Sequence, residues 1–307
     1  MGLTDPAPAV VVVGSVNTDY VVRVSRRPAD GETVTDAELS VLGGGKGANQ
    51  AIAAALTAGQ AGGPVAMVGR VGDDAAGASR LAELAAHGVL TGGIRVTPEV
   101  ATGSAFVTVT PDGGNAIMVA SGANARLTAA DITASAGLVS SARVLLAQLE
   151  VPPATVARAV RCAGPETTVV VNCAPFHHLD REVLTRVDLL VANETEAGQM
   201  LGGDVGDVRS ALAAVTAMVE FGPAAAVITL GADGAVVAAG GDSWHVPAPR
   251  VTPLDTTGAG DAFAGSLGAR LAAGVPLVPA VEFAVAVGSA TTGHLGALAR
   301  LPVEENA

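Results

Sequence analysis

Short apolar runs and longer amphipathic stretches take turns along most of the chain. The run at 10–13 consists only of valine, which is typical of a parallel strand buried on both faces. From residue 143 onward, predicted strands and helices alternate, as in parallel βαβ units covered by helices. We expect strands at 65–71, 143–148, 168–172, 189–192, 225–230 and 235–239, and helices at 48–58, 75–87, 153–162, 194–201, 208–221, 259–273 and 278–289. The pattern predicts an α/β fold over 1–307, a single domain with a central, mostly parallel sheet flanked by helices.

Two segments, at about 15–42 and 100–121, break this alternation. Their looser period-two pattern is typical of strands with one face exposed to water. The expected strands are 20–24, 33–42, 103–110 and 115–121, and a turn at 111–114 joins the last two. Ligands of open α/β sheets bind at the carboxyl ends of the strands. We therefore predict that the two segments fold together as a small β lid over that crevice.

Composition narrows the class of protein. Half of the 307 residues are hydrophobic and 15% are charged, which allows a sizeable core. No apolar run reaches the length of a membrane-spanning helix, and the apolar start at 7–13 reads as a first strand rather than a signal peptide. Two cysteines are too few for a disulfide framework, which indicates a reducing, cytoplasmic setting.

Charge and aromatic content restrict the partners. The net charge of -12 argues against general nucleic-acid binding, because phosphate backbones would be repelled. Aromatic residues make up only 2% of the chain, which disfavours base-stacking surfaces and membrane-interface belts. A small phosphorylated ligand is still compatible with this charge, since local N–H groups can hold it. We expect no nucleic-acid partner and no membrane partner.

The stretch DTTGAGDAF, at 255–263, is the first candidate for chemistry. Gly258 and Gly260 allow backbone N–H groups to point at one spot, and a helix starting near Ala259 adds its positive end there. Asp261 then lies in the first helical turn, where it can take a proton from a hydroxyl that attacks a phosphorus atom. The competing interpretation is a plain glycine turn with an aspartate near a helix start. Taken alone, the motif favours that plainer interpretation.

Two other glycine-rich segments follow predicted strands. GSVNTD, at 14–19, places Asn17 and Asp19 where α/β proteins bind ligands, and both side chains can bond the hydroxyls of a polyol. GGGKGANQ, at 43–50, permits close backbone approach and carries Asn49 on a new helix. Each segment can also be read as a simple connection between a strand and a helix. GSVNTD lacks the GxGxxG spacing, which disfavours a nicotinamide-dependent Rossmann enzyme.

Two segments in the second half are ambiguous by themselves. NETEA, at 193–197, spaces Asn193 and Glu196 three residues apart. Such a pair can order waters around Mg²⁺ bound to phosphates, or it can form a capping box, and the residues do not decide between the two. TLGADG, at 229–234, is either a tight turn or a place where a nucleotide approaches the backbone.

Taken together, these segments are specific enough to indicate one protein family. GSVNTD, GETVT, GGGKGANQA, QLE, NETEA, ITLGADG and DTTGAGDAF occur in this order between about residues 10 and 302. The chain resembles the PfkB family of sugar kinases, and within it most closely the ribokinases. The resemblance implies a ribokinase-like fold, ATP as phosphate donor, Mg²⁺, activation by K⁺, and a homodimer that forms through the lid.

The resemblance also implies roles for individual residues. The catalytic base falls on Asp261, and the anion hole for the γ-phosphate falls on Gly258, Ala259 and Gly260. The sugar contacts fall on Asn17, Asp19, Gly44, Gly45, Lys46, Asn49 and Glu150. The nucleotide and its Mg²⁺ fall on Asn193, Glu196, Thr229, Gly231, Gly234 and Gly260. The monovalent-cation loop falls on Asp255 and Thr257.

The C-terminal stretch departs from the family pattern. Gly296 fits the expected glycine near the cation, but Arg300 stands about where the family has a serine. The further candidates for cation ligands, Thr291, His294 and Gly296, therefore rest on an incomplete match.

The expected function is ATP-dependent phosphorylation of D-ribose at its 5-hydroxyl. The acceptor can also be 2-deoxyribose, fructose or a nucleoside, although a nucleoside base favours more aromatic surface than this chain offers. A non-catalytic sugar sensor is a third alternative. The intact Asp261 and its glycine turn disfavour a sensor, because binding alone needs no base.

Overall fold

The computed structural model describes residues 7–302 except 62, 113 and 295. A nine-stranded sheet forms its centre, in the order β13-β12-β11-β10-β9-β8-β1-β4-β5. Pairs from β11 to β5 are parallel, and β12 and β13 add two antiparallel pairs at one edge. The strands are β1 (Val10–Val13), β4 (Val65–Gly72), β5 (Val89–Thr97), β8 (Val144–Gln148), β9 (Thr168–Asn172), β10 (Leu189–Asn193), β11 (Ala225–Thr229), β12 (Ala235–Ala239) and β13 (Asp242–Val246). The predicted α/β class with a mostly parallel sheet is confirmed.

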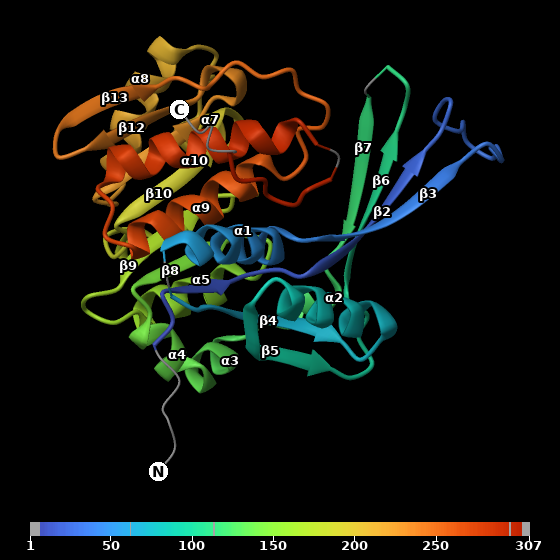
Figure 1. The fold of residues 1–307 in the computed structure, drawn as a ribbon, viewed down its shortest axis with the longest axis horizontal. Helices are drawn as coiled ribbons and strands as arrows, with labels where there is room; N and C mark the ends of the chain where they lie inside the picture. The colour runs from blue at the N-terminus through green and yellow to red at the C-terminus, as the bar shows by residue number, and fades with distance from the viewer. Residues whose placement is uncertain (1–6, 62, 113, 295, 303–307) are drawn as a thin grey trace.

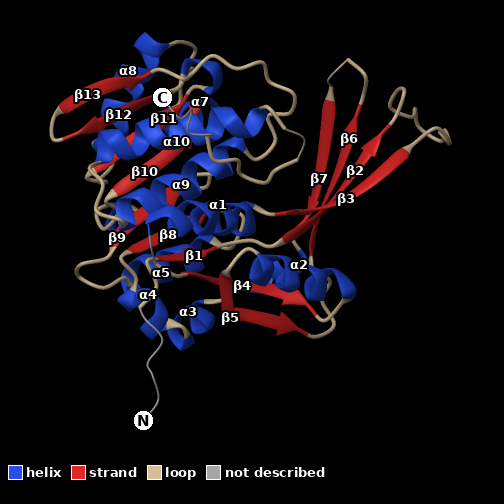
Figure 2. Ribbon diagram, in the orientation of Figure 1, coloured by secondary structure: helices blue, strands red, loops and turns tan. Residues whose placement is uncertain are grey.

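Helices cover both faces of this sheet (Figure 1, Figure 2). One face carries α1 (Lys46–Ala61), α2 (Ala75–Ala86), α9 (Ala259–Ala272) and α10 (Leu277–Thr292). The other carries α3 (Ala129–Ala134), α4 (Ala136–Ser141), α5 (Pro153–Cys162), α6 (Arg181–Leu184), α7 (Glu194–Leu201) and α8 (Val208–Val219). Two short 3-10 helices are η1 (Gly122–Arg126) and η2 (Gly231–Asp233).

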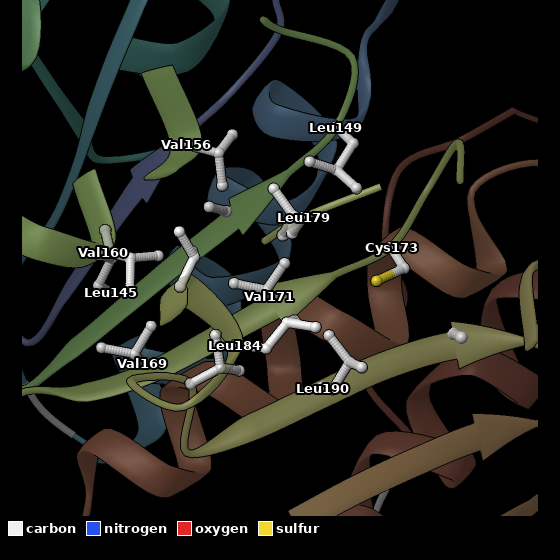
Figure 3. Close-up of a cluster of buried hydrophobic side chains, with 14 of the residues drawn as sticks. Leu145, Leu149, Val156, Val160, Val169, Val171, Cys173, Leu179, Leu184 and Leu190 are labelled. Carbon is white, nitrogen blue, oxygen red and sulfur yellow. The ribbon is translucent and has the colours of Figure 1, made fainter. Parts of the chain in front are cut away.

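The valine run of β1 supplies both halves of the core. Val10 and Val12 belong to the cluster under α1, α9 and α10, whereas Val11 and Val13 belong to the cluster on the opposite face. Successive side chains of a strand point to opposite faces, so a strand covered on both sides must be apolar throughout. Figure 3 shows the second cluster, in which side chains of the β8–β10 sheet pack against α5 and α6.

A separate four-stranded sheet projects from the body (Figure 1). Its strands are β2 (Asn17–Arg23), β3 (Glu38–Gly44), β6 (Gly103–Val109) and β7 (Asn115–Ala120), in the order β3-β2-β6-β7. β2 and β6 pair in parallel at the centre, and the two outer pairs are antiparallel. The two irregular segments of the sequence therefore meet in one sheet. β3 begins five residues later than the predicted 33–42 strand, and Gly113 of the predicted turn lies outside the described residues.

The sequence pattern missed two strands, β5 and β13. β5 contains Gly92 and Gly93, and glycine is depleted in strands. A side chain at Gly93 would lie 2.6 Å from the carbonyl oxygen of Met67 on the adjacent strand, so close strand packing explains this glycine. β13 is a largely exposed edge strand without apolar alternation. In the part of the chain that the structure describes, no helix has the length and apolar character needed to cross a bilayer.

Candidate active site

Two neighbouring cavities open at the carboxyl ends of the parallel strands, where the sequence predicted ligand binding. The first, which we call the acidic cavity, encloses about 870 Å³, and its lining includes Asp19, Lys46, Glu150, Asp255 and Asp261. The second, which we call the glycine-rich cavity, encloses about 650 Å³, and its lining includes Gly231, Gly234, Gly260 and Gly288. Pro253 and Thr256 line both, so the two spaces adjoin.

The start of α9 separates the two cavities. Gly258 and Asp261 line the acidic cavity, whereas Ala259 and Gly260 line the glycine-rich one. Gly258 caps the helix with a φ of 75°, and a side chain there would lie 2.5 Å from the Cα of Ala297. Only glycine avoids both the left-handed strain and the clash. The turn of DTTGAGD therefore brings a carboxylate and a run of helix-start amides to a shared boundary.

The helix start leaves backbone donors outside the helical ladder. Ala262 makes the first helical hydrogen bond, to the carbonyl of Gly258 at 2.8 Å. The N–H groups of Gly260 and Asp261 therefore precede the ladder, as the first-turn amides of any helix do. The N–H of Ala259 donates instead to the carbonyl of Thr256 at 3.3 Å.

Two amide side chains of α1 hold the carboxylate of Asp261, which is 7% exposed. Nδ2 of Asn49 donates to its Oδ2 at 3.0 Å, and Nε2 of Gln50 donates to its Oδ1 at 2.9 Å. The sequence placed Asn49 at the site. It missed Gln50, which lies one position further in the same GGGKGANQ segment.

The charged groups of the acidic cavity perturb one another. Burial, together with the charges of Glu150 and Asp261, raises the pKa of Asp19 to about 6, and Arg80 offsets part of this rise. The carboxylate of Asp261 raises the pKa of Lys46, with further contributions from Glu150 and Glu196, although burial of the ammonium opposes them. Lys46 is therefore held as a cation among acids.

Two side chains far apart in the sequence fix the predicted sugar contacts. Oε2 of Glu150 accepts a hydrogen bond from the hydroxyl of Ser15 at 2.5 Å and another from the N–H of Lys46 at 3.0 Å. Nδ2 of Asn124, in η1, donates to Oδ1 of Asn17 at 2.7 Å. The sequence alone did not mark Ser15 and Asn124 as site residues, because no local motif identifies a residue whose partner is more than 100 positions away.

Close backbone packing explains the glycines at the end of β3. A side chain on Gly44 would lie 2.2 Å from the carboxylate oxygens of Asp19. A side chain on Gly45 would lie 2.7 Å from the backbone nitrogen of Asn17. The glycines of GGGKGANQ therefore let the end of β3 lie directly against the NTD segment of β2, which places the two motifs side by side.

The NETEA segment forms the capping box that was one of its two interpretations. Oδ1 of Asn193 accepts from the N–H of Glu196 at 2.8 Å, and Oε2 of Glu196 accepts from the N–H of Asn193 at 2.9 Å. Burial raises the pKa of Glu196, and the hydrogen bond from Asn193 offsets part of this rise. Asn193 also lines the glycine-rich cavity, together with Thr229, Gly231 and Gly234.

Asp255 ties the loop before α9 to the C-terminal loop. Its Oδ1 accepts from the N–H of Thr257 and its Oδ2 from the N–H of Gly296, both at 2.9 Å. Burial raises the pKa of Asp255, but hydrogen bonds from the side chain of Thr257 and from the N–H groups of Gly296 and Thr257 outweigh burial and hold the pKa below its usual value. The structure thus brings Asp255, Thr257 and Gly296 together.

The other two cation candidates lie differently. The hydroxyl of Thr291 is fully buried, donates to the carbonyl of Val287 at 2.8 Å and accepts from the N–H of Arg300 at 3.0 Å. His294 is exposed on the turn after α10. Among the residues that the structure describes, no group of three or more His, Cys, Asp or Glu side chains is arranged to hold a metal ion.

A comparison with known proteins places this site in a known family. The family described as "pfkB family carbohydrate kinase" matches residues 7–304. The chain belongs to the PfkB family of carbohydrate kinases. Within this family it is 34% identical over 297 residues to the ribokinase of Haemophilus influenzae, covering 96% of each chain. It is 38% identical over 274 residues to the ribokinase of Mus musculus, covering 87% of this chain and 83% of that one.

Solved structures agree with this assignment. The structure of Arabidopsis thaliana ribokinase complexed with ribose and ATP matches with a TM-score of 0.87 and 29% sequence identity. The match covers 95% of this chain and 94% of that one. The fold is therefore ribokinase-like, as the sequence predicted, and the protein is an enzyme of the kinase class.

Proposed function

We propose that this kinase transfers the γ-phosphoryl group of ATP to the 5-hydroxyl of D-ribose. The observation that carries the proposal is the start of α9, where Asp261 faces the acidic cavity and Gly260 faces the glycine-rich one. A sugar in the first cavity and a nucleotide in the second would meet at this boundary, with the reacting atoms held in place by the same helical turn. The resemblance to ribokinases supports ribose as the acceptor.

Asp261 acts as the general base. Asn49 and Gln50 hold its two oxygens, so the carboxylate is oriented before the substrate arrives. The sugar hydroxyl attacks the γ-phosphorus and gives its proton to Asp261. The bond from the sugar oxygen to phosphorus forms, the bond from the γ-phosphorus to the β-bridging oxygen breaks, and ADP leaves.

The amides of Gly260 and Asp261 receive the charge of the transferring group. Both N–H groups precede the helical ladder, at the positive end of α9. Ala259 contributes less than predicted, because its N–H already bonds Thr256. Lys46 supplies the opposing charge that lets a phosphate approach Asp261, Glu150 and Glu196.

The sugar hydroxyls bind on the opposite wall of the acidic cavity. Asn17 and Asp19 come from β2, and Glu150 follows β8. Since Asn124 and Ser15 hold two of these side chains, the wall is preformed. Gly45, Lys46 and Asn49 also line this cavity and complete the contacts that we assign to the sugar. Gly44 was predicted as a further contact, but it is buried against the carboxylate of Asp19 and does not line the cavity.

The nucleotide lies in the glycine-rich cavity against Asn193, Thr229, Gly231 and Gly234. Mg²⁺ would be held mainly by the phosphates and by waters that Asn193 and Glu196 order, which suits an ion that keeps most of its waters. The donors fit this indirect role, because the capping box occupies the single side-chain oxygen of Asn193 and one of the two carboxylate oxygens of Glu196. When bound, Mg²⁺ neutralises charge on the β- and γ-phosphates.

We assign the K⁺ site to the loop around Asp255, with the backbone of Thr257 and the Gly296 segment. The ion would lie next to the start of α9, where its charge strengthens the anion hole. Thr291 and His294 are less suited as ligands, since the hydroxyl of Thr291 already makes two hydrogen bonds and His294 is exposed.

We further propose a homodimer that forms through the four-stranded sheet. Val41, Tyr20, Phe106 and Met118 form one cross-strand row over all four strands, on the face turned away from the acidic cavity. The rings of Tyr20 and Phe106 stack with centroids 5.2 Å apart, and Met118 is 68% exposed. An exposed apolar row of this kind is typical of a protein interface.

Light scattering tests the dimer. The wild-type protein should have twice the chain mass, and Met118→Lys should have the mass of one chain. Phe221→Lys is the control, because Phe221 is an exposed apolar side chain after α8, outside this sheet. A wild-type protein that is monomeric at every concentration would overturn the dimer.

A cytoplasmic location is consistent with the two free thiols. Cys162 and Cys173 form no disulfide, and burial raises the pKa of Cys173 to about 12, so its thiol stays protonated. Free thiols are typical of a reducing compartment.

ATP turnover by the purified protein tests the function. The assay contains Mg²⁺ and K⁺ and compares ribose, 2-deoxyribose, fructose and adenosine as acceptors. Ribose should give the highest kcat/KM. Turnover with another acceptor but not with ribose would overturn ribose as the substrate and keep the kinase chemistry. Binding of ribose without any turnover would favour a non-catalytic sugar sensor.

A further inference from the structure

We infer that Gln50 is a positioning residue that fixes which oxygen of Asp261 takes the proton, and that a buried chain of amides fixes Gln50 in turn. Nε2 of Gln50 donates to Oδ1 of Asp261 at 2.9 Å and to Oδ1 of Asn172 at 3.1 Å. Oε1 of Gln50 accepts from Nε2 of Gln148 at 2.9 Å. Gln50 thus connects Asp261 on α9 with the ends of two central strands, β8 and β9.

The chain of amides has a defined direction. Nδ2 of Asn172 donates to the carbonyl of Val191 at 3.2 Å. A carbonyl only accepts hydrogen bonds, so the amide nitrogen of Asn172 must face Val191 and its oxygen must face Gln50. Gln50 then presents its N–H group to Asn172 and to Asp261. The amide of Gln50 therefore cannot turn over without losing both bonds.

Complete burial makes this arrangement stiff. Gln50 and Gln148 are 0% exposed, and Asn172 is 7% exposed. A buried amide without a partner is costly, and no bulk water is present to replace a lost bond. Because Gln50 also keeps its oxygen on Gln148, both ends of its side chain are anchored inside the protein.

The two amides of α1 hold different oxygens of Asp261. Asn49 lines the acidic cavity and bonds Oδ2, whereas Gln50 is buried behind it and bonds Oδ1. Oδ1 is therefore turned toward the interior, and Oδ2 is the oxygen that reaches the cavity. The proton of the attacking sugar hydroxyl goes to Oδ2 of Asp261, and Gln50 does not touch the substrate. This inference rests on the proposed function only in taking Asp261 as the base.

The experiment compares Gln50→Met with a matched control on the same two helices. Gln50→Met keeps the length of the side chain and removes its hydrogen bonds. The hydroxyl of Thr57 donates to that of Ser266 at 3.0 Å, also buried and also joining α1 to α9, but away from Asp261. Thr57→Val therefore removes a buried bond between the same helices. Steady-state kinetics and thermal unfolding are measured for both variants, and the crystal structure of Gln50→Met is determined.

Gln50→Met should lower kcat about thirtyfold while the KM values for sugar and ATP stay within about threefold, because a misoriented base impairs the chemical step rather than binding. Its crystal structure should show the Asp261 carboxylate rotated away from its present position. Thr57→Val should keep kcat within about twofold at a similar loss of thermal stability.

Equal kcat values for the two variants, or an Asp261 side chain that stays in place in the crystal, would overturn the inference. If Gln50→Met does not fold, Gln148→Met removes the next bond in the chain and should lower kcat in the same direction. An unchanged kcat for that variant counts against the inference. The ratio of variant to wild type is taken with whichever sugar is turned over, and the crystal structure needs no turnover. Failure of ribose as substrate is therefore distinguishable from failure of this inference.

Discussion

Two helices of this protein, α7 and α9, both carry an acid at the third helical position but use it differently. Each has an acid at the third helical position, Glu196 in α7 and Asp261 in α9. In α7 the acid folds back on the N–H of Asn193 and closes a capping box. In α9 the cap is Gly258, without a side-chain bond, and the acid turns instead to Asn49 and Gln50.

The difference shows what a helix start gives up when it serves a ligand. The capping box of α7 satisfies two backbone donors with its own side chains. At the start of α9, the cap residue Gly258 has no side chain to bond the first-turn amides, and the acid bonds side chains of another helix instead. An uncapped start is less stable, but it presents N–H groups and a carboxylate to the same boundary between two cavities.

Asp261→Asn is the largest expected effect. The amide keeps the size of the side chain and cannot accept the hydroxyl proton, so kcat should fall about a thousandfold. The matched change in α7 is Glu196→Gln, and it should lower kcat far less, because that acid closes a cap. Steady-state kinetics of the two variants test the comparison. Equal losses would show that both acids act in the chemistry.

Gly258→Ala tests whether the cap of α9 must be glycine. The added methyl group would clash with the backbone of Ala297, and alanine is strained at the φ of 75° that Gly258 adopts. The free energy of unfolding should therefore fall by about 3 kcal/mol. Denaturant unfolding measures the change.

Gly260→Ala is the control, since a side chain at Gly260 meets nothing within 4 Å. It should leave stability unchanged or raise it by up to about 1 kcal/mol, as replacement of glycine inside a helix does. A Gly258→Ala variant as stable as Gly260→Ala would contradict the account of the cap.

Asp19→Asn tests the cost of burying the Asp19 carboxylate among the acids around α9. Because the folded protein raises the pKa of Asp19 from its usual 3.8 to about 6, it holds this proton more tightly than the unfolded chain does. The corresponding stability is fully present below about pH 3.8 and is lost as the pH rises through about 6. Asp19→Asn should therefore raise the free energy of unfolding at pH 8 by roughly 2 kcal/mol. The gain should vanish toward pH 4, and a gain independent of pH would rule out this cause.

Asn193→Ala should lower the free energy of unfolding by about 1 kcal/mol from the lost cap, less than Gly258→Ala does. Its control is Asp207→Ala, because Asp207 caps the exposed start of α8 with the same kind of box. Both variants should lose similar stability, but only Asn193→Ala should raise the KM for ATP, by about fivefold. An unchanged KM for ATP would show that the NETEA segment only caps α7 and does not take part in nucleotide binding.

Local patterns predicted the parts of this structure that depend on near neighbours. The valine run of β1, the hairpin of β6 and β7, and the helix that begins within DTTGAGD each follow from a few consecutive residues. β5 escaped notice because Gly92 and Gly93 interrupt its pattern, and the reason for Gly93 lies in the adjacent strand. Ser15 and Asn124 were missed at the site for the same reason, since their bonds to Glu150 and Asn17 span 135 and 107 positions.

The sequence by itself determined the α/β class, the family, and the segments that line the two cavities, because periodicity and short motifs are properties of consecutive residues. Only the tertiary structure decided that Gln50 bonds Asp261, that Glu196 closes a cap, and that Thr291 has its hydroxyl already engaged. The physical reason is that a buried polar side chain must find its partner wherever the fold brings one. The identity of that partner is a property of packing between distant segments and cannot be read from either segment alone.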